Sequence, residues 1–176
     1  IPGDAQALGI ATVYQDLALV DHRDVASNIY LGIEPKTAGV LIDRRKMWAD
    51  AKTVIESVRT TIQSPKTEVG ILSGGQRQAV AIARSLVRGS RLFIMDEPTA
   101  ALGVEQSAMV LSLLSDLKQS GAGVLLISHN MSHVFDVVDR VVVLRHGKKV
   151  AERIKSNTSP EEIVGLITGA IDGELG

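Results

Sequence analysis

The sequence predicts an α/β protein with a mostly parallel sheet and a helical segment inserted after its first strand. Two short apolar runs, at residues 92–95 and 124–127, enclose a helical pattern at residues 104–118. Strands that are continuously apolar rather than alternating are typical of parallel sheets buried on both faces. Between an earlier β-prone run at 9–14 and residue 92, apolar residues recur at helical spacing.

Composition limits the classes of protein that fit. The 176 residues are 45% hydrophobic, which is enough for one domain with a real core. Nineteen basic residues nearly balance 20 acidic ones, so net charge gives no reason to expect a nucleic-acid partner. The absence of cysteine excludes disulfides and cysteine metal clusters, and it fits a reducing, cytoplasmic compartment. No apolar run reaches the roughly 20 residues of a membrane span.

The expected elements follow one another with recognisable start and stop signals. Asp24, Asp43 and Ser159 are typical helix N-caps, and Gly89 is a typical helix end. The predicted order is a strand at 9–14, helices at 24–30, 43–62 and 74–87, a strand at 92–95, a helix at 104–118, a strand at 124–127, a helix at 131–138, a hairpin of 141–144 and 149–153 that closes the sheet, and a helix from 159. We interpret Ile1, which follows no initiator methionine or signal-peptide pattern, as a cut.

The run Leu-Ser-Gly-Gly-Gln-Arg-Gln begins a predicted helix, where free backbone N–H groups attract anions. Gly74 and Gly75 allow a phosphate to approach the backbone closely, and Ser73 either caps the helix or donates its hydroxyl to phosphate. Taken alone, Ser-Gly-Gly is more typical of an ordinary N-cap than of a binding site. Gln76 completes the run.

Polar residues follow each of the predicted strands. Asp96 and Glu97 come directly after the strand at 92–95, where ligands bind in open α/β sheets. A carboxylate there suits Mg²⁺, held partly through water, and a second one suits polarisation of a water that attacks a phosphoryl group. Gln15 and His129 also follow strands, but a lone glutamine or histidine in such a place is more often structural.

Together these runs resemble the ATPase domains of ABC transporters over residues 9–155. Leu-Ser-Gly-Gly-Gln is similar to the family's signature motif, and the apolar strand ending in Asp96-Glu97 is similar to Walker B with its catalytic glutamate. Ser128-His129-Asn130 resembles the switch histidine, and Gln15 resembles the Q-loop glutamine.

The resemblance implies a P-loop NTPase (RecA-like) fold, with an α/β core of 1–15 and 90–176 and a helical subdomain of 16–89. It implies that Glu97 and His129 are catalytic, and that Gln15, Ser73, Gly74, Gly75, Gln76 and Asp96 bind ATP. It implies Mg²⁺ near Gln15 and Asp96, a head-to-tail dimer of ATPase domains, and permease subunits that hold the protein at the inner face of the plasma membrane.

Two features depart from the family pattern. Gly103 stands where the family's D-loop usually has aspartate, and Ala100-Ala101-Leu102-Gly103 resembles ATPases of monosaccharide importers. The phosphate loop Gly-x-x-x-x-Gly-Lys-Ser/Thr occurs nowhere in the sequence. In the family this loop precedes the Q-loop, so we expect a domain that is incomplete at its N-terminus.

Three hypotheses remain open. The first is an ATP-hydrolysing subunit that energises import of a monosaccharide, with the 176-residue chain inactive by itself. The second is a non-catalytic fragment with a structural or regulatory role. The third is an ABC ATPase that acts outside transport, in translation or DNA repair, which co-purification with ribosomes or DNA would favour.

Overall fold

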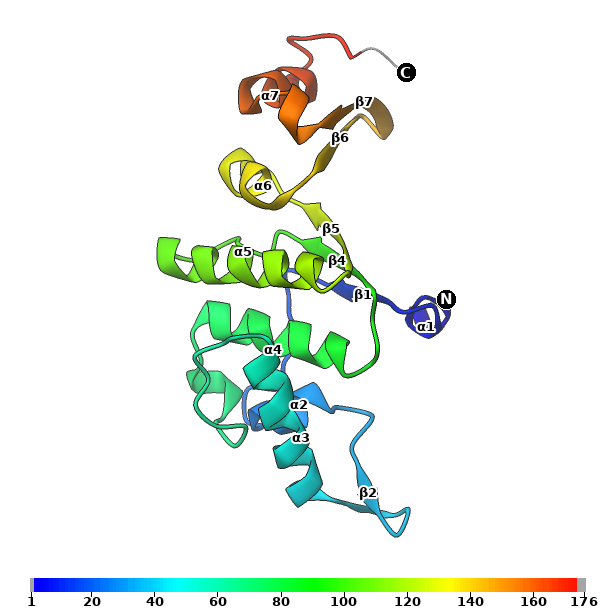
Figure 1. Cartoon of the computed structure of the whole chain (residues 1–176), viewed down its shortest axis with the longest axis vertical. Helices are drawn as coiled ribbons and strands as arrows, with labels where there is room; N and C mark the ends of the chain where they lie inside the picture. The colour runs from blue at the N-terminus through cyan, green and yellow to red at the C-terminus, as the bar shows by residue number, and fades with distance from the viewer. Residues whose placement is uncertain (1, 174–176) are drawn as a thin grey trace. The chain divides into compact units, whose positions relative to one another are not determined.

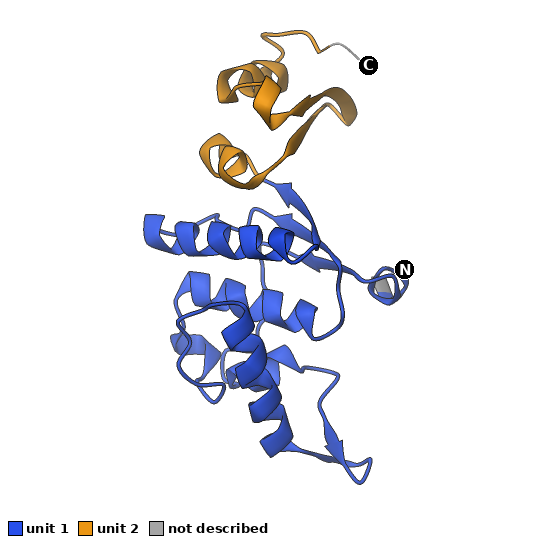
Figure 2. Cartoon of the chain, viewed as in Figure 1, with its two compact units in different colours: residues 1–127 blue, residues 128–176 orange. Residues whose placement is uncertain are grey.

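The computed structural model describes residues 2–173 (Figure 1). The chain divides into two compact units, residues 1–127 and 128–176 (Figure 2). Each unit is treated by itself. Unit 1 contains α1 (Pro2–Ala7), β1 (Ile10–Val13), α2 (Val25–Ile29), β2 (Lys36–Thr37), β3 (Leu41–Ile42), α3 (Arg44–Ser57), a 3₁₀ turn (Val69–Ile71), α4 (Gly74–Leu86), β4 (Leu92–Asp96), α5 (Val104–Gln119) and β5 (Gly123–Ile127). Unit 2 contains α6 (Met131–Val137), β6 (Arg140–Arg145), β7 (Lys148–Ile154), a second 3₁₀ turn (Lys155–Asn157) and α7 (Pro160–Thr168).

The sheet of unit 1 has the strand order β1-β4-β5, and both pairings are parallel (Figure 1). Met95 is opposite Val13 on one side and Leu126 on the other. The carboxyl ends of the three strands therefore meet at one edge. This arrangement confirms the predicted α/β class with a parallel sheet.

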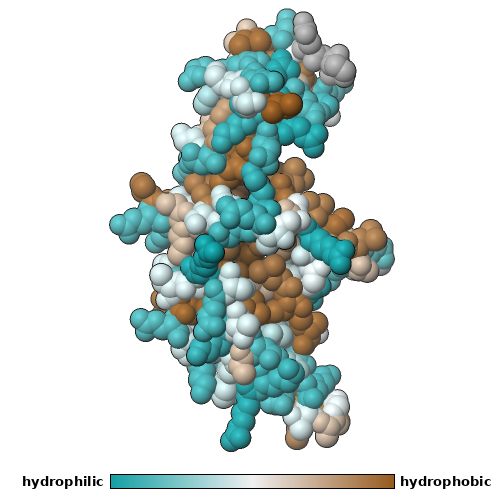
Figure 3. All heavy atoms as spheres, in the orientation of Figure 1, coloured by the Kyte–Doolittle hydropathy of each residue, from teal (hydrophilic) through white to brown (hydrophobic). Residues whose placement is uncertain are grey.

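Only one face of this sheet is buried. Phe93 and Met95 lie in a core with residues of α4 and α5, and both are fully buried. The alternate residues point the other way, and Leu125 and Ile127 are 52% and 48% exposed. Figure 3 shows hydrophobic residues at the surface over the strands. The expectation that the strands are buried on both faces is wrong, because α4 and α5 pack on the same face.

The helical region between β1 and β4 has a hydrophobic core of its own, made by α2, α3 and α4. Its fully buried members include Ile29 and Ala51. Asp24 and Asp43 cap α2 and α3 as predicted, accepting from the N–H groups of Ser27 and Lys46. The short α1 and the β2–β3 hairpin were not predicted.

The helix predicted over 43–62 ends early, at Ser57. Arg59 adopts a left-handed backbone with φ of 47°, which no continuing α-helix can accommodate. The β-branched run Thr60-Thr61-Ile62 follows it and disfavours helix further. Ile62 is nevertheless buried, because the chain folds back onto the helical core after the turn.

Unit 2 is built on a hairpin with an α-helix packed on it. β6 and β7 are antiparallel and are joined by His146 and Gly147, both with positive φ, as a tight two-residue turn requires. The predicted hairpin is confirmed, but it forms a two-stranded sheet of its own rather than closing the parallel sheet. Ser159 caps α7 as predicted, and Ile163 and Leu166 bury its apolar face.

Within residues 2–173, no helix is both long and apolar enough to cross a bilayer.

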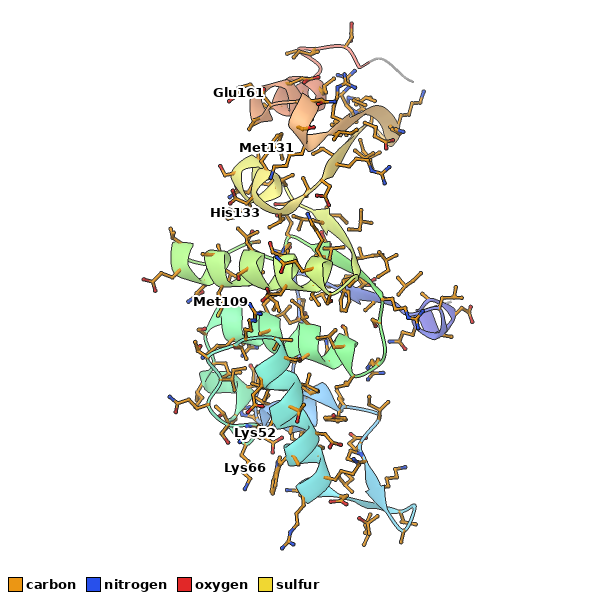
Figure 4. All side chains as sticks on the ribbon, in the orientation of Figure 1. Lys52, Lys66, Met109, Met131, His133 and Glu161 are labelled. Carbon is orange, nitrogen blue, oxygen red and sulfur yellow. The ribbon has the colours of Figure 1, made fainter. Side chains whose placement is uncertain are left out.

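Asp24 joins three parts of the helical region. One carboxylate oxygen accepts from the Ser27 N–H at 2.7 Å, and the other accepts from the Trp48 indole at 3.0 Å. The ammonium group of Lys66, labelled in Figure 4, lies 4.2 Å from the centroid of the same ring. Partial burial alone would raise the pKa of Asp24, but the hydrogen bonds from Ser27 and Trp48 outweigh it and lower the pKa.

We predict that Asp24→Asn destabilises the protein at pH 7 by about 1 kcal/mol, because the new amide cannot accept from both Ser27 and Trp48. A lowered folded pKa contributes stability above the ordinary value of 3.8, and that stability is lost as pH falls. The difference between the two proteins should therefore shrink below pH 3.8. Urea unfolding followed by circular dichroism at several pH values measures it. Asp50→Asn, which removes a surface pair with Lys46, is the control and should change little.

Candidate functional site

The predicted acid pair lies at the carboxyl edge of the sheet. Asp96 is the last residue of β4 and Glu97 follows it; both are half-buried. Val13 is opposite Met95, so Gln15 leaves β1 at the level where Glu97 leaves β4. The structure therefore brings Gln15, Asp96 and Glu97 to one edge, from the two adjacent parallel strands β1 and β4, where ligands bind in open α/β sheets.

Glu97 has an unusual backbone. Its φ is 47°, in the left-handed region that side-chain-bearing residues rarely adopt. Hydrogen bonds hold it on both sides: its N–H donates to the Ile127 carbonyl at 2.9 Å, and its own carbonyl accepts from the Ala100 N–H at 3.0 Å. Strain of this kind persists where the surrounding structure fixes the residue, and it occurs often at functional sites. The backbone thus fixes where the Glu97 carboxylate leaves the sheet.

The N-terminus of α4 is closed by a capping box. The Ser73 hydroxyl accepts from the Gln76 N–H at 3.4 Å, and the Gln76 side chain accepts from the Ser73 N–H at 3.0 Å. The Gln76 amide also donates to the Thr61 hydroxyl at 3.0 Å. Because Ser73 acts as an acceptor in the cap, its hydroxyl hydrogen remains suited to donation toward an anion. Both predicted uses of Ser73 are therefore compatible.

The two glycines of this helix start have a packing role that the sequence analysis missed. A Cβ on Gly74 would collide with the side chain of Leu102, and one on Gly75 would collide with Met109 of α5. Figure 4 labels Met109 beside α4. Glycine at these two positions therefore leaves room for the side-chain ends of Leu102 and Met109.

His129 lies in unit 2, just before α6, and it is exposed. The next residue, Asn130, caps α6 by accepting from the His133 N–H at 3.2 Å, and its own N–H donates to the Ser128 hydroxyl at 3.1 Å. The short segment after β5 is therefore turned sharply into α6. The proposed role of His129 stays a prediction.

No group of three or more histidine, cysteine or acidic side chains suited to a metal occurs among residues 2–173. Asp96 and Gln15 offer one carboxylate and one amide at adjacent strand ends. That donor set fits Mg²⁺, which binds through one or two carboxylates and keeps waters and substrate phosphates as its other ligands.

A hollow of about 300 Å³ opens in the helical region, away from these residues. Asn28, Met47 and Ile42 contribute to its wall, and Arg23, Arg44 and Glu34 bring charge to it. None of its lining residues is a candidate for ATP binding or catalysis.

Comparison with known proteins identifies the family. A sequence profile described as ABC transporter matches residues 4–100, which include Gln15, Ser73–Gln76, Asp96 and Glu97. The xylose/arabinose import ATP-binding protein XylG of Sulfolobus acidocaldarius is 41% identical over 174 residues, covering 99% of this chain and 69% of the relative. The chain belongs to the ABC transporter family. The predicted resemblance is confirmed.

Other members of the ABC transporter family are similarly close. The fructose import ATP-binding protein FrcA of Rhizobium meliloti is 42% identical over 176 residues, covering 96% of this chain and 68% of the relative. The ribose import ATP-binding protein RbsA 1 of Streptomyces avermitilis is 40% identical over 166 residues, covering 94% of this chain and 31% of the relative.

Solved structures support the fold. A nucleotide-free ATP-binding cassette from an ABC transporter superposes with a TM-score of 0.75 at 21% identity, over 96% of this chain and 68% of that one. An ATP-binding cassette in its ADP conformation gives a TM-score of 0.74 at 22% identity, over 95% of this chain and 67% of that one. The P-loop NTPase fold class predicted from the sequence is confirmed.

Gly103, which replaces the usual D-loop aspartate of ABC ATPases, is the N-cap of α5. Its φ of −69° and ψ of 169° suit any residue, and no atom lies within 4 Å of the position that a Cβ would take. Without a side chain it makes no cap hydrogen bond to the first turn of α5. The structure therefore tolerates aspartate at this position.

We predict that Gly103→Asp stabilises the protein by about 1 kcal/mol, because aspartate caps α5, favours the helix dipole and restricts the unfolded chain. For a chain of this size that corresponds to a rise of roughly 2–4 °C in Tm. Thermal unfolding measures it. Gly103→Ala restricts the unfolded chain without capping, so a Tm for Gly103→Asp no higher than that of Gly103→Ala would contradict the capping argument.

Proposed function

We propose that this chain is part of an ATP-binding and ATP-hydrolysing subunit that energises an ABC importer of a monosaccharide. The observation that carries the proposal is the meeting of Gln15, Asp96 and Glu97 at one sheet edge within the region matched by the family. The relatives add the substrate class, since they are named for import of xylose and arabinose, of fructose and of ribose.

In this proposal Glu97 polarises the water that attacks the γ-phosphoryl group, and its fixed backbone keeps the carboxylate in place. Asp96 and Gln15 would hold Mg²⁺, in part through water, and His129 would contact the γ-phosphate. When bound, Mg²⁺ neutralises charge that develops on the phosphate oxygens. Catalysis then rests on positioning and charge stabilisation rather than on covalent chemistry.

The N-terminus of α4 serves a neighbouring ATPase domain rather than its own. Ser73, Gly74, Gly75 and Gln76 present a hydroxyl and first-turn N–H groups at the positive end of a 13-residue helix. In a head-to-tail dimer this surface closes over ATP held by the phosphate loop of the partner domain. Each nucleotide is thus enclosed by two chains.

Transmembrane permease subunits are the other proposed partners, and they place the protein at the inner face of the plasma membrane. The helical region, residues 16–89, is proposed to contact them. The hollow beside Asn28 and Met47 is a concave surface on which a permease segment can dock. The proposal assigns no nucleic-acid partner.

We predict that the 176-residue chain alone shows no measurable ATP turnover, because its sequence contains no phosphate loop to grip the β- and γ-phosphates. A version that carries a phosphate-loop segment ahead of Ile1 should hydrolyse ATP. In that version Glu97→Gln should lower turnover by about 100-fold or more while ATP binding is retained. Phosphate release and equilibrium binding of a fluorescent ATP analogue measure the two effects.

The matched control is Glu105→Gln, which changes an exposed acid in the first turn of α5. It should leave turnover unchanged. Turnover by the 176-residue chain itself, or full activity of the Glu97→Gln version, would contradict the assignment.

We predict that the same version, assembled with its permease and sugar-binding protein in membrane vesicles, accumulates a pentose or hexose when ATP is supplied. Uptake of labelled xylose, arabinose, fructose and ribose measures this, and Glu97→Gln serves as the inactive control. Co-purification with ribosomes or DNA, with no sugar uptake, would instead favour an ABC ATPase that acts outside transport.

A further inference from the structure

Three arginines of α4 and its C-terminal end reach to the chain that leads away from Gln15. Arg84 donates to the carbonyl of Leu17 at 2.7 Å and to that of Ala18 at 2.9 Å. Arg77 donates to the Asp21 carboxylate at 2.6 Å, and Arg88 donates to the Leu31 carbonyl at 2.5 Å. Their spacing of 7 and 4 positions places them along one side of the helix.

Arg84 differs from Arg88 in its surroundings. It is half-buried, whereas Arg88 is exposed. Burial, followed by the neighbouring charge of Arg88, lowers the pKa of Arg84. A partly desolvated guanidinium needs well-placed hydrogen-bond acceptors. The two hydrogen bonds of Arg84 go to consecutive backbone carbonyls, which its planar fork of donors can reach together.

The turn that Arg84 holds is strained. Ala18 has a φ of 47°, in the left-handed region that alanine rarely adopts. Its N–H donates to the Asp16 carboxylate at 3.1 Å, and its carbonyl accepts from Arg84. Such a conformation persists only when its surroundings fix it. Two contacts reach this turn from outside the local chain: the Arg84 guanidinium bonds its carbonyls, and the sheet core receives the Leu17 side chain.

We propose that Arg84 is a positioning residue, which ties the turn after Gln15 to the helix that begins with Ser73–Gln76. One rigid element then carries the candidate anion-binding N-terminus at one end and the clamp on the Gln15 segment at the other. A shift of α4 moves both. This inference rests on the proposed function, in which Gln15 serves the nucleotide of its own chain and Ser73–Gln76 cover the nucleotide of the partner. The Arg84 contact then links those two nucleotides.

The chain contains no cysteine, so a single Gln15→Cys substitution allows one nitroxide label to be attached at residue 15. We expect Arg84→Gln to increase the mobility of this label by roughly threefold, as the freed turn gains fast local motion. Arg88→Gln removes a comparable arginine-to-carbonyl bond farther along the same segment and should leave the label unchanged. Electron paramagnetic resonance spectra of the 176-residue chain provide the measurement.

Thermal unfolding of the labelled proteins separates a local effect from a loss of the fold. If Arg84→Gln does not fold, Arg84→Lys takes its place in the test. Lysine keeps the charge but not the planar fork of donors, so we expect the label mobility to rise by less than the increase given for Arg84→Gln. Equal label mobility in three folded proteins would overturn the proposal: the labelled Arg84 variant, the labelled Arg88 variant and the labelled Gln15→Cys protein without an arginine substitution. These spectra need no ATP, so they stand whatever the outcome of the turnover experiment.

The phosphate-loop version gives the second readout. We expect Arg84→Gln there to lower kcat by about tenfold while KM for ATP changes by less than about twofold, because the clamp orients Gln15 and does not hold the nucleotide. Arg88→Gln should change neither constant. A rise in KM at constant kcat would assign Arg84 to nucleotide binding and overturn the positioning role.

Discussion

The packing of α4 between two hydrophobic cores is the constraint on which the rest of unit 1 depends. Ala79 and Ile82 face the sheet core, while Val80 and Ala83 face the core of the helical region. All four are at most 2% exposed, so the helix has little freedom to slide or rotate without opening one core. Small residues on both sides let the helix approach each layer closely. This helix therefore joins the helical region to the sheet.

Rigid placement of α4 explains how distant polar residues keep a fixed relation to one another. Its first turn is closed by Ser73 and Gln76 and lies against α5, which follows the β4 edge after the turn at Glu97. Its last turn holds the segment after Gln15 through Arg84. Left-handed residues occur near two candidate site residues, at Ala18 in the turn after Gln15 and at Glu97 itself. Hydrogen bonds hold each of them: Arg84 of α4 donates to the Ala18 carbonyl, and the Glu97 N–H donates to the Ile127 carbonyl of β5.

Much of this could be predicted from the sequence, for identifiable reasons. Helix starts at Asp24, Asp43 and Ser159 were predictable because capping is local chemistry. The end of α3 was not, because Arg59 carries no glycine-like signal for its positive φ. The exposed sheet face was also missed, since an apolar run does not reveal which layers cover it. The acid pair at the β4 edge was predictable from strand period and family resemblance, whereas the arginine clamp depends on contacts between residues more than 60 positions apart.

In the proposed function, the N-terminus of α4 takes part in a nucleotide site that it does not form alone. The capping box uses the N–H of Gln76 for the Ser73 hydroxyl, while helix geometry gives the first-turn N–H groups of Gly74 and Gly75 no intrahelical acceptor. Two N–H groups and a helix dipole attract an anion only weakly where water competes, because such attractions contribute about 1 kcal/mol at an exposed surface. A triphosphate bound with useful affinity must therefore be gripped by a further cradle, and in the proposed dimer the α4 terminus closes that grip from the opposite side. Under this proposal its effect on catalysis depends on how closely α4 approaches the nucleotide, and the packing of α4 and the Arg84 contacts then determine that approach.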